Sequence, residues 1–379
     1  MPRFITRIQV RNYKSIASCD VKLHSLSILV GRNGAGKSNF LDAIDFIADS
    51  LVDGPESAIL SRGGINSVRR WSGGRPNDID IRLDFRLDAT RSASYNLSVG
   101  AKKGKDYVIK DEVCSVINRN TKEVLARFQA IDGNVVSSEP TLAFFSDRLY
   151  LTAASNQRNF RAVYAALSHM VFYDFNTAEL REPQSPALAD YLLPDGRNIG
   201  SVLREMERRF PKAKQRIVRY LSRITDDIID VKPRTAGSRI YIDFEQQHSD
   251  GAVRRFSAAS MSLGTIRVLA LLVALFQEAA VEGARVGLIG IEEPEIALHP
   301  GALAVLLDAM EDASEDRQVI LTSHSTDMLD RKDLHPRSIL YAEMIEGDTI
   351  VRPLSEVSTS AIMDRMYTPG ELLRTRQLA

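Results

Sequence analysis

The sequence predicts an α/β fold in which two segments of alternating strands and helices are separated by a helical middle. A compact apolar run at residues 26–30 precedes a glycine-rich turn and a segment with helical spacing, and a second apolar run at residues 286–291 ends in acidic residues. Short apolar runs of this kind are typical of buried parallel strands. Between them, residues 154–230 have a helical pattern. We therefore expect one α/β head that is split in the sequence by an insertion.

The first part of the chain predicts two strands, a tight loop, a helix and then an antiparallel meander. The strands are expected at Ile5–Val10 and Val21–Val30, and the helix at Lys37–Leu51. Alternating apolar residues separated by turn residues predict the meander. Its strands are expected at Ile79–Leu87, Tyr95–Val99, Tyr107–Ile109 and Glu112–Asn118.

The same kinds of pattern predict helices and strands in the middle and the last part of the chain. A helical stripe joins Ile217, Leu221, Ile224 and Ile228. A hairpin is expected around Ser249-Asp250-Gly251. The remaining elements are a helix at Thr265–Ala280, a strand at Val286–Ile291, a helix at Gly301–Ala313, and strands at Gln318–Thr322 and Ser338–Ala342. We expect an N-terminal lobe at residues 1–153, a helical insertion at 154–230 and a C-terminal lobe at 231–379.

Composition excludes several classes of protein. In a chain of 379 residues, 44% hydrophobic and 26% charged residues exclude a largely disordered protein. Lys+Arg and Asp+Glu both number 49, so any nucleic-acid binding must come from a local basic patch. Two cysteines, Cys19 and Cys114, exclude a disulfide framework and a four-thiolate metal site. With no signal-peptide pattern and no apolar stretch of ~20 residues, we expect a cytoplasmic protein without a membrane span.

A phosphate-binding loop is the most specific motif. Gly31-Arg32-Asn33-Gly34-Ala35-Gly36-Lys37-Ser38 matches G-x-x-x-x-G-K-[ST] between an apolar strand and a helix. The glycines let consecutive N–H groups face phosphate oxygens, and the helix N-terminus adds positive potential. We expect Lys37 to contact the β- and γ-phosphates of a nucleotide and the Ser38 hydroxyl to bind Mg²⁺.

An acidic strand end is the second motif. The apolar residues 287–291 run directly into Glu292-Glu293-Pro294-Glu295. Carboxylates past a buried strand lie at the edge of the sheet where open α/β folds bind ligands. We assign Glu292 to the metal and Glu293 to the base that accepts a proton from the attacking water. A solvated strand end is the alternative.

Two further motifs are less specific by themselves. Ser262-Leu263-Gly264-Thr265 precedes an apolar helix, where Ser262 or Thr265 is either a simple helix cap or part of a second anion site. His324 follows the strand at Gln318–Thr322, where it is either structural or a contact to a γ-phosphate oxygen. His299 serves either the site or a dimer contact.

In chain order the four motifs are the phosphate loop, the serine–glycine helix start, the acidic strand end and the histidine. That order resembles the ABC-type ATPase heads of the RecF/SMC group, and most closely short bacterial AAA family ATPases of the RecF-like and OLD-like kind. Three phrases carry the resemblance: residues 8–16 (IQVRNYKSI), 292–300 (EEPEIALHP) and 322–325 (TSHS). The resemblance implies an ABC-type P-loop ATPase head with an antiparallel β meander and a short helical insertion. It covers most of the chain except the helical middle, which is far too short for an SMC rod.

The resemblance also implies a mechanism. Two heads would form an ATP-linked homodimer in which Gly31–Ser38 of one subunit faces Ser262, Leu263 and Gly264 of the other. Glu293 and His324 would be the catalytic residues. Gln184 would join Ser38 and Glu292 at the Mg²⁺ ion, and Arg62 lies where some SMC heads carry a regulatory arginine, with a turn residue as the alternative. The nucleotide-binding residues carried over are Gly31, Arg32, Asn33, Gly34, Ala35, Gly36, Lys37, Ser38, Asn39, Ser262 and Gly264.

The sequence departs from the group's pattern at two positions. Glu292 stands where many ABC ATPases have Asp, and Leu263 stands where a small or polar residue is commoner. The first departure concerns the metal geometry and the second the contact between subunits.

A basic run in the helical middle is a candidate DNA surface. Such a run could neutralise several phosphates, although a solvated helix face is the commoner explanation. Its members, which occur without an intervening acid, are Arg208, Arg209, Lys212, Lys214, Arg216, Arg219 and Arg223.

Three functions remain open at this point. The first is an ATP-hydrolysing switch that acts on DNA or in anti-phage defence. The second is an ATPase sensor subunit that controls a nuclease or toxin partner. The third is the nucleotide-binding subunit of a transporter, against which the Arg11-Asn12-Tyr13-Lys14 and Glu292–Glu295 phrases and the helical middle argue.

Overall fold

The chain forms two units in a computed structural model. The structure describes residues 4–71, 77–102, 105–140, 148–187, 191–225, 227–278, 286–331, 334–375 and 377–378. Unit 1 comprises Met1–Met170 and Asp316–Ala379, and unit 2 comprises Val171–Glu315. These boundaries differ from the three segments expected from the sequence, since residues 231–315 group with the helical middle and residues 154–170 group with the N-terminal part.

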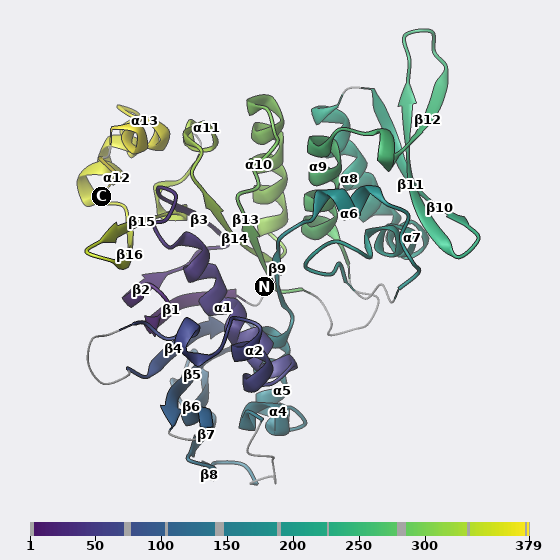
Figure 1. The fold of residues 1–379 in the computed structure, drawn as a ribbon. Coiled ribbons are helices and arrows are strands. Elements are labelled where there is room, and N and C mark those ends of the chain that lie inside the picture. Colours follow the sequence, from purple (N-terminus) through teal and green to yellow (C-terminus); the bar gives the residue numbers. More distant parts are fainter. Residues whose placement is uncertain are drawn as a thin grey trace. The chain divides into compact units, whose positions relative to one another are not determined.

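Unit 1 is built on a mixed sheet (Figure 1). Its strands follow the order β8-β7-β6-β5-β4-β1-β2-β16-β15-β3-β14. Their bounds are β1 Phe4–Tyr13, β2 Ile16–Lys22, β3 Leu26–Val30, β4 Ile79–Arg86, β5 Arg91–Lys102, β6 Lys105–Asn118, β7 Val124–Ile131, β8 Asn134–Ser137, β14 Gln318–Ser323, β15 Ile339–Ile345 and β16 Asp348–Pro353. The expected meander is confirmed, because β4 to β8 pair with their neighbours in antiparallel fashion.

Two predicted strand boundaries are wrong. Val21–Val30 is two strands, because His24 donates its N–H to Ser27 Oγ at 3.0 Å and the chain turns there. The turn lets β2 pair antiparallel with β1 while β3 pairs parallel with β14. The two segments expected at residues 107–109 and 112–118 are the single strand β6, whose register shifts between residues 98 and 99 of its partner β5.

Helices of unit 1 pack against this sheet, and α1, α5 and η2 contact its strands. Helix α1 is the longest of those described and buries an apolar face that includes Phe40, Ile44 and Ile47. It packs against β1, β14, α2 and α5. The helical elements are α1 Lys37–Val52, α2 Pro55–Leu60, α3 Ile65–Val68, α4 Tyr150–Ala154, α5 Arg158–Ser168, α11 Thr326–Leu329, α12 Glu356–Met363, α13 Pro369–Arg374 and the 3-10 turn η2 Pro336–Ser338.

The meander is fixed to α4 through a buried carboxylate. Glu112 on β6 is fully buried and accepts hydrogen bonds from Tyr150 N at 2.6 Å, Leu151 N at 3.0 Å and Tyr95 Oη at 3.0 Å. Burial raises the pKa of Glu112 to about 7. The carboxyl of Glu112 therefore holds its proton more tightly in the folded protein than in the unfolded chain.

We expect this carboxyl to make stability depend on pH. Its folded pKa of about 7 lies above its ordinary value of 4.5, so its contribution is complete below pH 4.5 and is lost as pH rises towards 7. The free energy of unfolding of the wild type should fall, relative to that of Glu112→Gln, by about 1.4 kcal/mol per pH unit in this window. Urea titrations of both proteins at several pH values measure this. Parallel stability curves would show that Glu112 ionises normally.

Unit 2 combines a helical layer with a three-stranded antiparallel sheet, in the order β10-β11-β12 (Figure 1). Its very apolar helix α9 packs against α6, α7, α8 and α10, and strand β13 lies beside β9. The bounds are β9 Met170–Tyr173, α6 Thr177–Arg181, α7 Ile199–Arg209, α8 Pro211–Ile224, β10 Ile228–Ala236, β11 Arg239–Gln247, β12 Val253–Ser257, the 3-10 turn η1 Ala258–Ser260, α9 Leu263–Phe276, β13 Leu288–Glu292 and α10 Pro300–Ser314.

The predicted elements of unit 2 are largely confirmed. The expected hairpin is β11–β12, and the helices and strand predicted after residue 264 are α9, β13 and α10. The sequence predicts Ile228 as part of the helical stripe, and this prediction is wrong. Helix α8 ends at Ile224, and Ile228 is the first residue of β10. The predicted end of the α9 helix, Ala279–Ala280, lies outside the described residues. Among the described residues, no helix is both long and apolar enough to cross a membrane.

Candidate nucleotide site

The phosphate loop of unit 1 joins β3 to α1. Gly34 and Gly36 have φ angles of 79° and 86°, in the left-handed region that favours glycine. A Cβ at Gly36 would lie 1.9 Å from Thr349 Oγ1, so this position also excludes a side chain for lack of space. Helix α1 begins at Lys37 without a side-chain cap. The positive end of its dipole therefore faces the loop, as an anion site requires.

Lys37 lies across this loop. Its side chain is buried, and Nζ donates hydrogen bonds to Gly31 O at 2.9 Å and Arg32 O at 3.2 Å. Ser38, the next residue, is exposed. An ammonium group held over a turn of positive-φ glycines at an uncapped helix start fits the phosphates of a nucleotide. The exposed hydroxyl of Ser38 is a hard oxygen donor of the kind that Mg²⁺ prefers.

The turn between β1 and β2 supports α1 from the side. Asn12 and Lys14 have φ angles of 55° and 46°, a strained conformation for residues with side chains. Asp42 of α1 holds this turn, because it accepts the Tyr13 hydroxyl at 2.6 Å and pairs with Lys14 Nζ at 2.5 Å. Strain of this kind persists where neighbouring contacts impose it.

A chain of polar contacts continues to the loop. Asn39 donates from Nδ2 to Ser15 Oγ at 2.6 Å, and Ser15 Oγ lies 2.6 Å from Thr349 Oγ1. Asn39 thus uses its amide to support the loop, and its role as a nucleotide contact stays a prediction.

Arg62, which follows α2 in the chain, has a buried side chain that forms ion pairs with three aspartates of α1. Its guanidinium contacts Asp42 at 2.7 Å, Asp45 at 3.0 Å and Asp49 at 2.7 Å. Burial and the neighbouring Asp49 raise the pKa of Asp45 to about 7. The sequence motif around Arg62 does not include these three partners. Their spacing of three and four residues, which places them on one helix face, is the signal that could have found them.

The register of the sheet places His324 at the same edge as the phosphate loop. Ser323, the last residue of β14, pairs with Val30, the last residue of β3, in a parallel ladder. His324 and Gly31 therefore leave neighbouring strands at the same level, and His324 is exposed. A contact to a γ-phosphate is compatible with this placement and stays a prediction.

Unit 2 carries the acidic strand end. Glu292 is the last residue of β13, and Glu293 follows with a φ of 42°. Both side chains are partly exposed. Among the described residues, no group of three or more His, Cys, Asp or Glu side chains is arranged to hold a metal ion. The Glu292 carboxylate is an oxygen donor of the kind that Mg²⁺ prefers, and Mg²⁺ usually keeps several waters and binds substrate phosphates.

The helix start at Ser262 has the local geometry of a cap. Ser262 Oγ accepts a hydrogen bond from Thr265 N at 3.1 Å, so the capping role is confirmed. Gly264 lies so close to the chain after β13 that a Cβ there would be 2.6 Å from Ala297 O. His299 likewise caps a helix, because its Nδ1 accepts from Ala302 N at 3.2 Å at the start of α10.

Gln184 is held inside unit 2. Its Oε1 accepts from Gly200 N at 2.8 Å, its backbone pairs with Ile240, and its Nε2 has no hydrogen-bond partner among the described residues. One of the two lone pairs of Oε1 is thus engaged by Gly200 N. The metal role of Gln184 stays a prediction.

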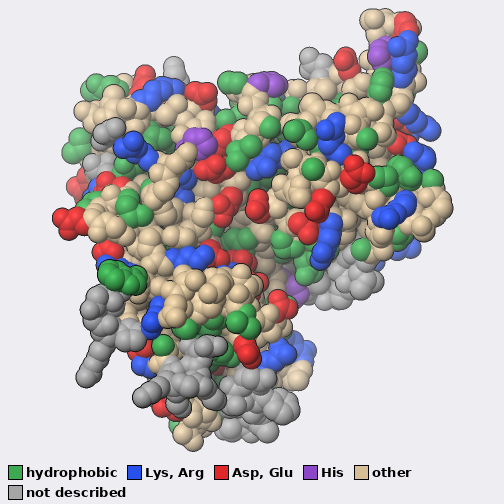
Figure 2. All heavy atoms as spheres, in the orientation of Figure 1, with side chains coloured by type: hydrophobic (Ala, Val, Ile, Leu, Met, Phe, Trp, Pro, Cys, Tyr) green, Lys and Arg blue, Asp and Glu red, His purple; other side chains and the backbone are tan. Residues whose placement is uncertain are grey.

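The basic run does not form a row of unpaired cations in unit 2. Arg208 and Arg209 pair with Glu205 of the same helix. Most of the others pair with acids of α7, α10 and β10: Lys214 with Glu207 and Asp230, Arg216 and Arg219 with Asp312, and Arg223 with Asp308. Figure 2 shows basic and acidic side chains interspersed on the visible surface. Each pair reduces the charge available to a phosphate, so DNA binding through this run stays a prediction without support from the geometry.

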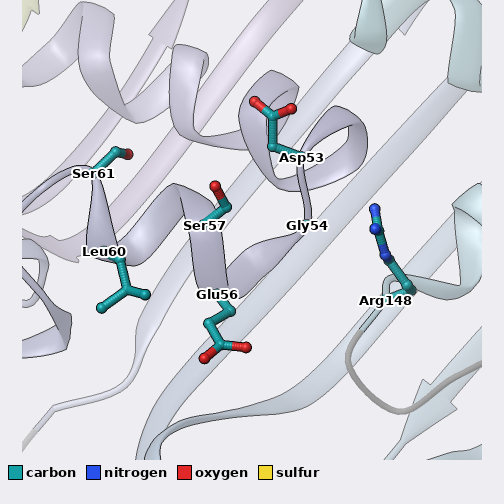
Figure 3. Close-up of a pocket in the computed structure, with 7 residues that line it drawn as sticks. All are labelled: Asp53, Gly54, Glu56, Ser57, Leu60, Ser61 and Arg148. Atoms are coloured by element: carbon teal, nitrogen blue, oxygen red, sulfur yellow. The ribbon is translucent and has the colours of Figure 1, made fainter.

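A pocket in unit 1 lies apart from the motifs. It has a volume of about 430 Å³. Figure 3 shows Arg148 on one side and the acidic and hydroxyl side chains of residues 53–61 on the other. Its lining residues are Asp53, Gly54, Glu56, Ser57, Leu60, Ser61 and Arg148. It contains none of the predicted site residues.

The predicted site residues are thus divided between the two units. Unit 1 brings together the phosphate loop and His324, whereas Glu292, Glu293, Ser262, Gly264 and Gln184 belong to unit 2.

Comparison with known proteins identifies the family. A family model described as "AAA domain, putative AbiEii toxin, Type IV TA system" matches residues 26–330, well over half of the chain. The chain belongs to this AAA domain family. The match includes the phosphate loop, the helix start at Ser262, the acidic strand end and His324.

Solved structures show the same fold as this AAA domain protein. An SMC head bound to the C-winged helix domain of ScpA is 14% identical, with a TM-score of 0.55, and the likeness covers 93% of this chain and 99% of that one. An SMC head with an extended coiled coil from Pyrococcus furiosus, bound to the C-terminal domain of ScpA, is 13% identical, with a TM-score of 0.56 and coverage of 96% and 99%. The resemblance to SMC-type ATPase heads is therefore confirmed at the level of the fold.

A curated SMC protein also matches part of this chain in sequence. Structural maintenance of chromosomes protein 1 of Schizosaccharomyces pombe is 24% identical over an alignment of 147 residues, and the alignment covers 35% of this chain. The match spans 12% of that relative's length. The family match thus identifies an AAA domain, and the solved structures show that its fold is that of an SMC head.

Proposed function

We propose that this AAA domain protein binds and hydrolyses ATP with Mg²⁺ and uses the nucleotide to join two copies of the chain. The observation that carries the proposal is the phosphate loop, in which the Lys37 ammonium lies over two loop carbonyls at an uncapped helix start. An ATP phosphate chain would replace these carbonyls as the partner of Lys37. No other described segment combines positive-φ glycines, a buried lysine and the start of a long helix.

The roles of the remaining residues follow from their chemistry. Ser38 and Glu292 would hold Mg²⁺, which neutralises phosphate charge when it is bound. Glu293 would accept the proton of the attacking water, and His324 would donate a hydrogen bond to a phosphate oxygen. The α9 start would present Ser262 and its N–H groups to a nucleotide held by a second subunit.

We propose that the ATP-dependent pairing controls a partner protein rather than acts on DNA directly. Two observations favour this choice. The basic run is largely neutralised by acids of unit 2. The family description names a toxin, and both SMC heads above were solved with a bound ScpA domain. A nuclease or toxin component of a defence system is the kind of partner that fits.

A mixing experiment tests whether two chains share each site. Lys37→Ala disables the phosphate loop. Leu263→Glu places a negative charge at the exposed first residue of α9, where it suits the helix dipole but repels a phosphate. We expect each variant alone to lack ATP hydrolysis. A mixture should regain part of the rate, because mixed dimers contain one site that is intact on both sides.

Two results would contradict the shared site. The first is a Leu263→Glu protein that hydrolyses ATP at the wild-type rate by itself. The second is a mixture that stays inactive although co-purification through a tag on one variant shows mixed dimers. A wild type that binds ATP but stays monomeric would contradict the pairing altogether.

A further inference from the structure

The backbone at the acidic strand end of unit 2 is strained. Glu293 and Ala297 have φ angles of 42° and 65°, in a region that residues with a Cβ rarely adopt. Within this segment, Ile296 N donates to Glu293 O at 3.2 Å, and Leu298 N donates to Glu295 O at 3.0 Å. Such conformations persist only where surrounding contacts impose them. Contacts with another part of unit 2 must therefore impose the conformation of residues 293–297.

Arg267 of α9 supplies two of these contacts. It is only 8% exposed, and its Nη2 donates hydrogen bonds to Glu292 O at 3.3 Å and Glu293 O at 3.2 Å. Burial lowers the pKa of the guanidinium, and its Nε has no hydrogen-bond partner among the described residues. A buried cation with an unsatisfied donor costs stability. Packing alone does not account for an arginine at this position.

The same helix also contacts the far end of the strained segment. A Cβ at Gly264 would lie 2.6 Å from Ala297 O, so the first turn of α9 fits closely against Ala297. Gly264 and Arg267 are one turn apart and hold the two ends of the segment from Glu292 to Ala297. The helix start and the acidic strand end are thus one connected piece within unit 2.

We propose that Arg267 is a positioning residue for Glu293. By holding the carbonyls of Glu292 and Glu293, it keeps the strand end in the left-handed conformation that sets the direction in which the Glu293 side chain leaves the backbone. Arg267 acts through Glu293 and not on the nucleotide. The inference rests on the proposed ATPase function, because it assigns Arg267 to the base of that reaction.

Steady-state kinetics test the role. In Arg267→Met we expect kcat for ATP hydrolysis to fall about 10- to 100-fold, because small displacements of a catalytic group have effects of this size. The KM for ATP should change little, since Lys37 and the phosphate loop are untouched. Arg267→Lys should recover most of the rate, because an ammonium also donates to carbonyl oxygens.

Gln277→Met is the matched control on the same helix. Gln277 is buried, accepts from Leu192 N at 2.5 Å and donates to Tyr173 Oη at 2.6 Å, so its loss perturbs α9 at the opposite end. Its kcat should stay within a fewfold of the wild-type value. An equal loss of kcat in both variants would reduce Arg267 to a structural role and overturn the proposal.

Hydrogen exchange without nucleotide gives a readout that does not depend on activity. Peptides that cover residues 292–298 should exchange faster in Arg267→Met than in the wild type and in Gln277→Met. Unchanged exchange there would overturn the proposal even if kcat fell. If the wild type hydrolyses no ATP, the proposed function fails, and the exchange result still decides whether Arg267 holds the strand end.

Discussion

Glu293→Gln is expected to lose most ATP hydrolysis while it retains ATP binding. Removal of a general base typically lowers a rate by 10²- to 10⁴-fold. The amide is nearly isosteric with the carboxylate and carries no charge, so the strand end and its contacts with Arg267 should survive. Bound ATP would then persist, and the paired form of the chain should accumulate. Phosphate release and size measurement with ATP and Mg²⁺ check both parts of the expectation.

Two neighbouring carboxylates provide the comparisons. Glu295→Gln changes the same charge two residues later and should keep most of the activity. Glu292→Gln should weaken the Mg²⁺ dependence, because we assign Glu292 to the metal. If Glu292→Gln traps ATP and Glu293→Gln hydrolyses it normally, the two assigned roles are reversed.

Lys37→Ala is expected to weaken ATP binding by about 10²- to 10⁴-fold. A hydrogen bond from a charged donor contributes about 1.5–3 kcal/mol, and the Lys37→Ala variant would lack two such bonds to the phosphates. In the described structure its ammonium bonds to Gly31 O and Arg32 O, so the variant also leaves these two carbonyls without their donor. Calorimetric titration with ATP and Mg²⁺ measures the change in affinity.

Lys110→Ala is the control for the loss of a lysine. Lys110 also belongs to unit 1, but it is largely exposed and pairs with Asp78 at 2.6 Å on the meander. Its ATP affinity should match that of the wild type. A Lys37→Ala protein with wild-type affinity would place the nucleotide site elsewhere in the chain.

The elements of the fold follow closely from sequence patterns where the pattern is local. The run at residues 26–30, the loop after it and α1 occur as expected, because strand, turn and helix each depend on neighbouring residues. The break at His24 was missed, because the separation of β2 from β3 depends on which strands they pair with. Pairing partners are distant in the sequence, so a window of neighbouring residues does not reveal them.

The basic run illustrates the same limit for function. Its seven cations occur between residues 208 and 223 without an intervening acid, which suggested a surface for phosphates. In the folded unit 2, Asp308 and Asp312 of α10 lie against α8 and take up much of this charge. Those acids are more than eighty residues away in the chain. Their neutralising effect is a property of helix packing alone.

The sequence by itself determined which residues we propose to carry the chemistry: the loop Gly31–Ser38, the acidic pair Glu292 and Glu293, and the helix start at Ser262. Each of these motifs consists of adjacent residues whose conformation and chemistry depend on one another. Only the tertiary structure decided what holds them in place. Arg62 gathers three aspartates of α1, and Arg267 holds the carbonyls of a strand end 25 residues further along the chain. The physical reason is that a guanidinium acts over a few ångströms in space, whatever the separation of its partners in the chain.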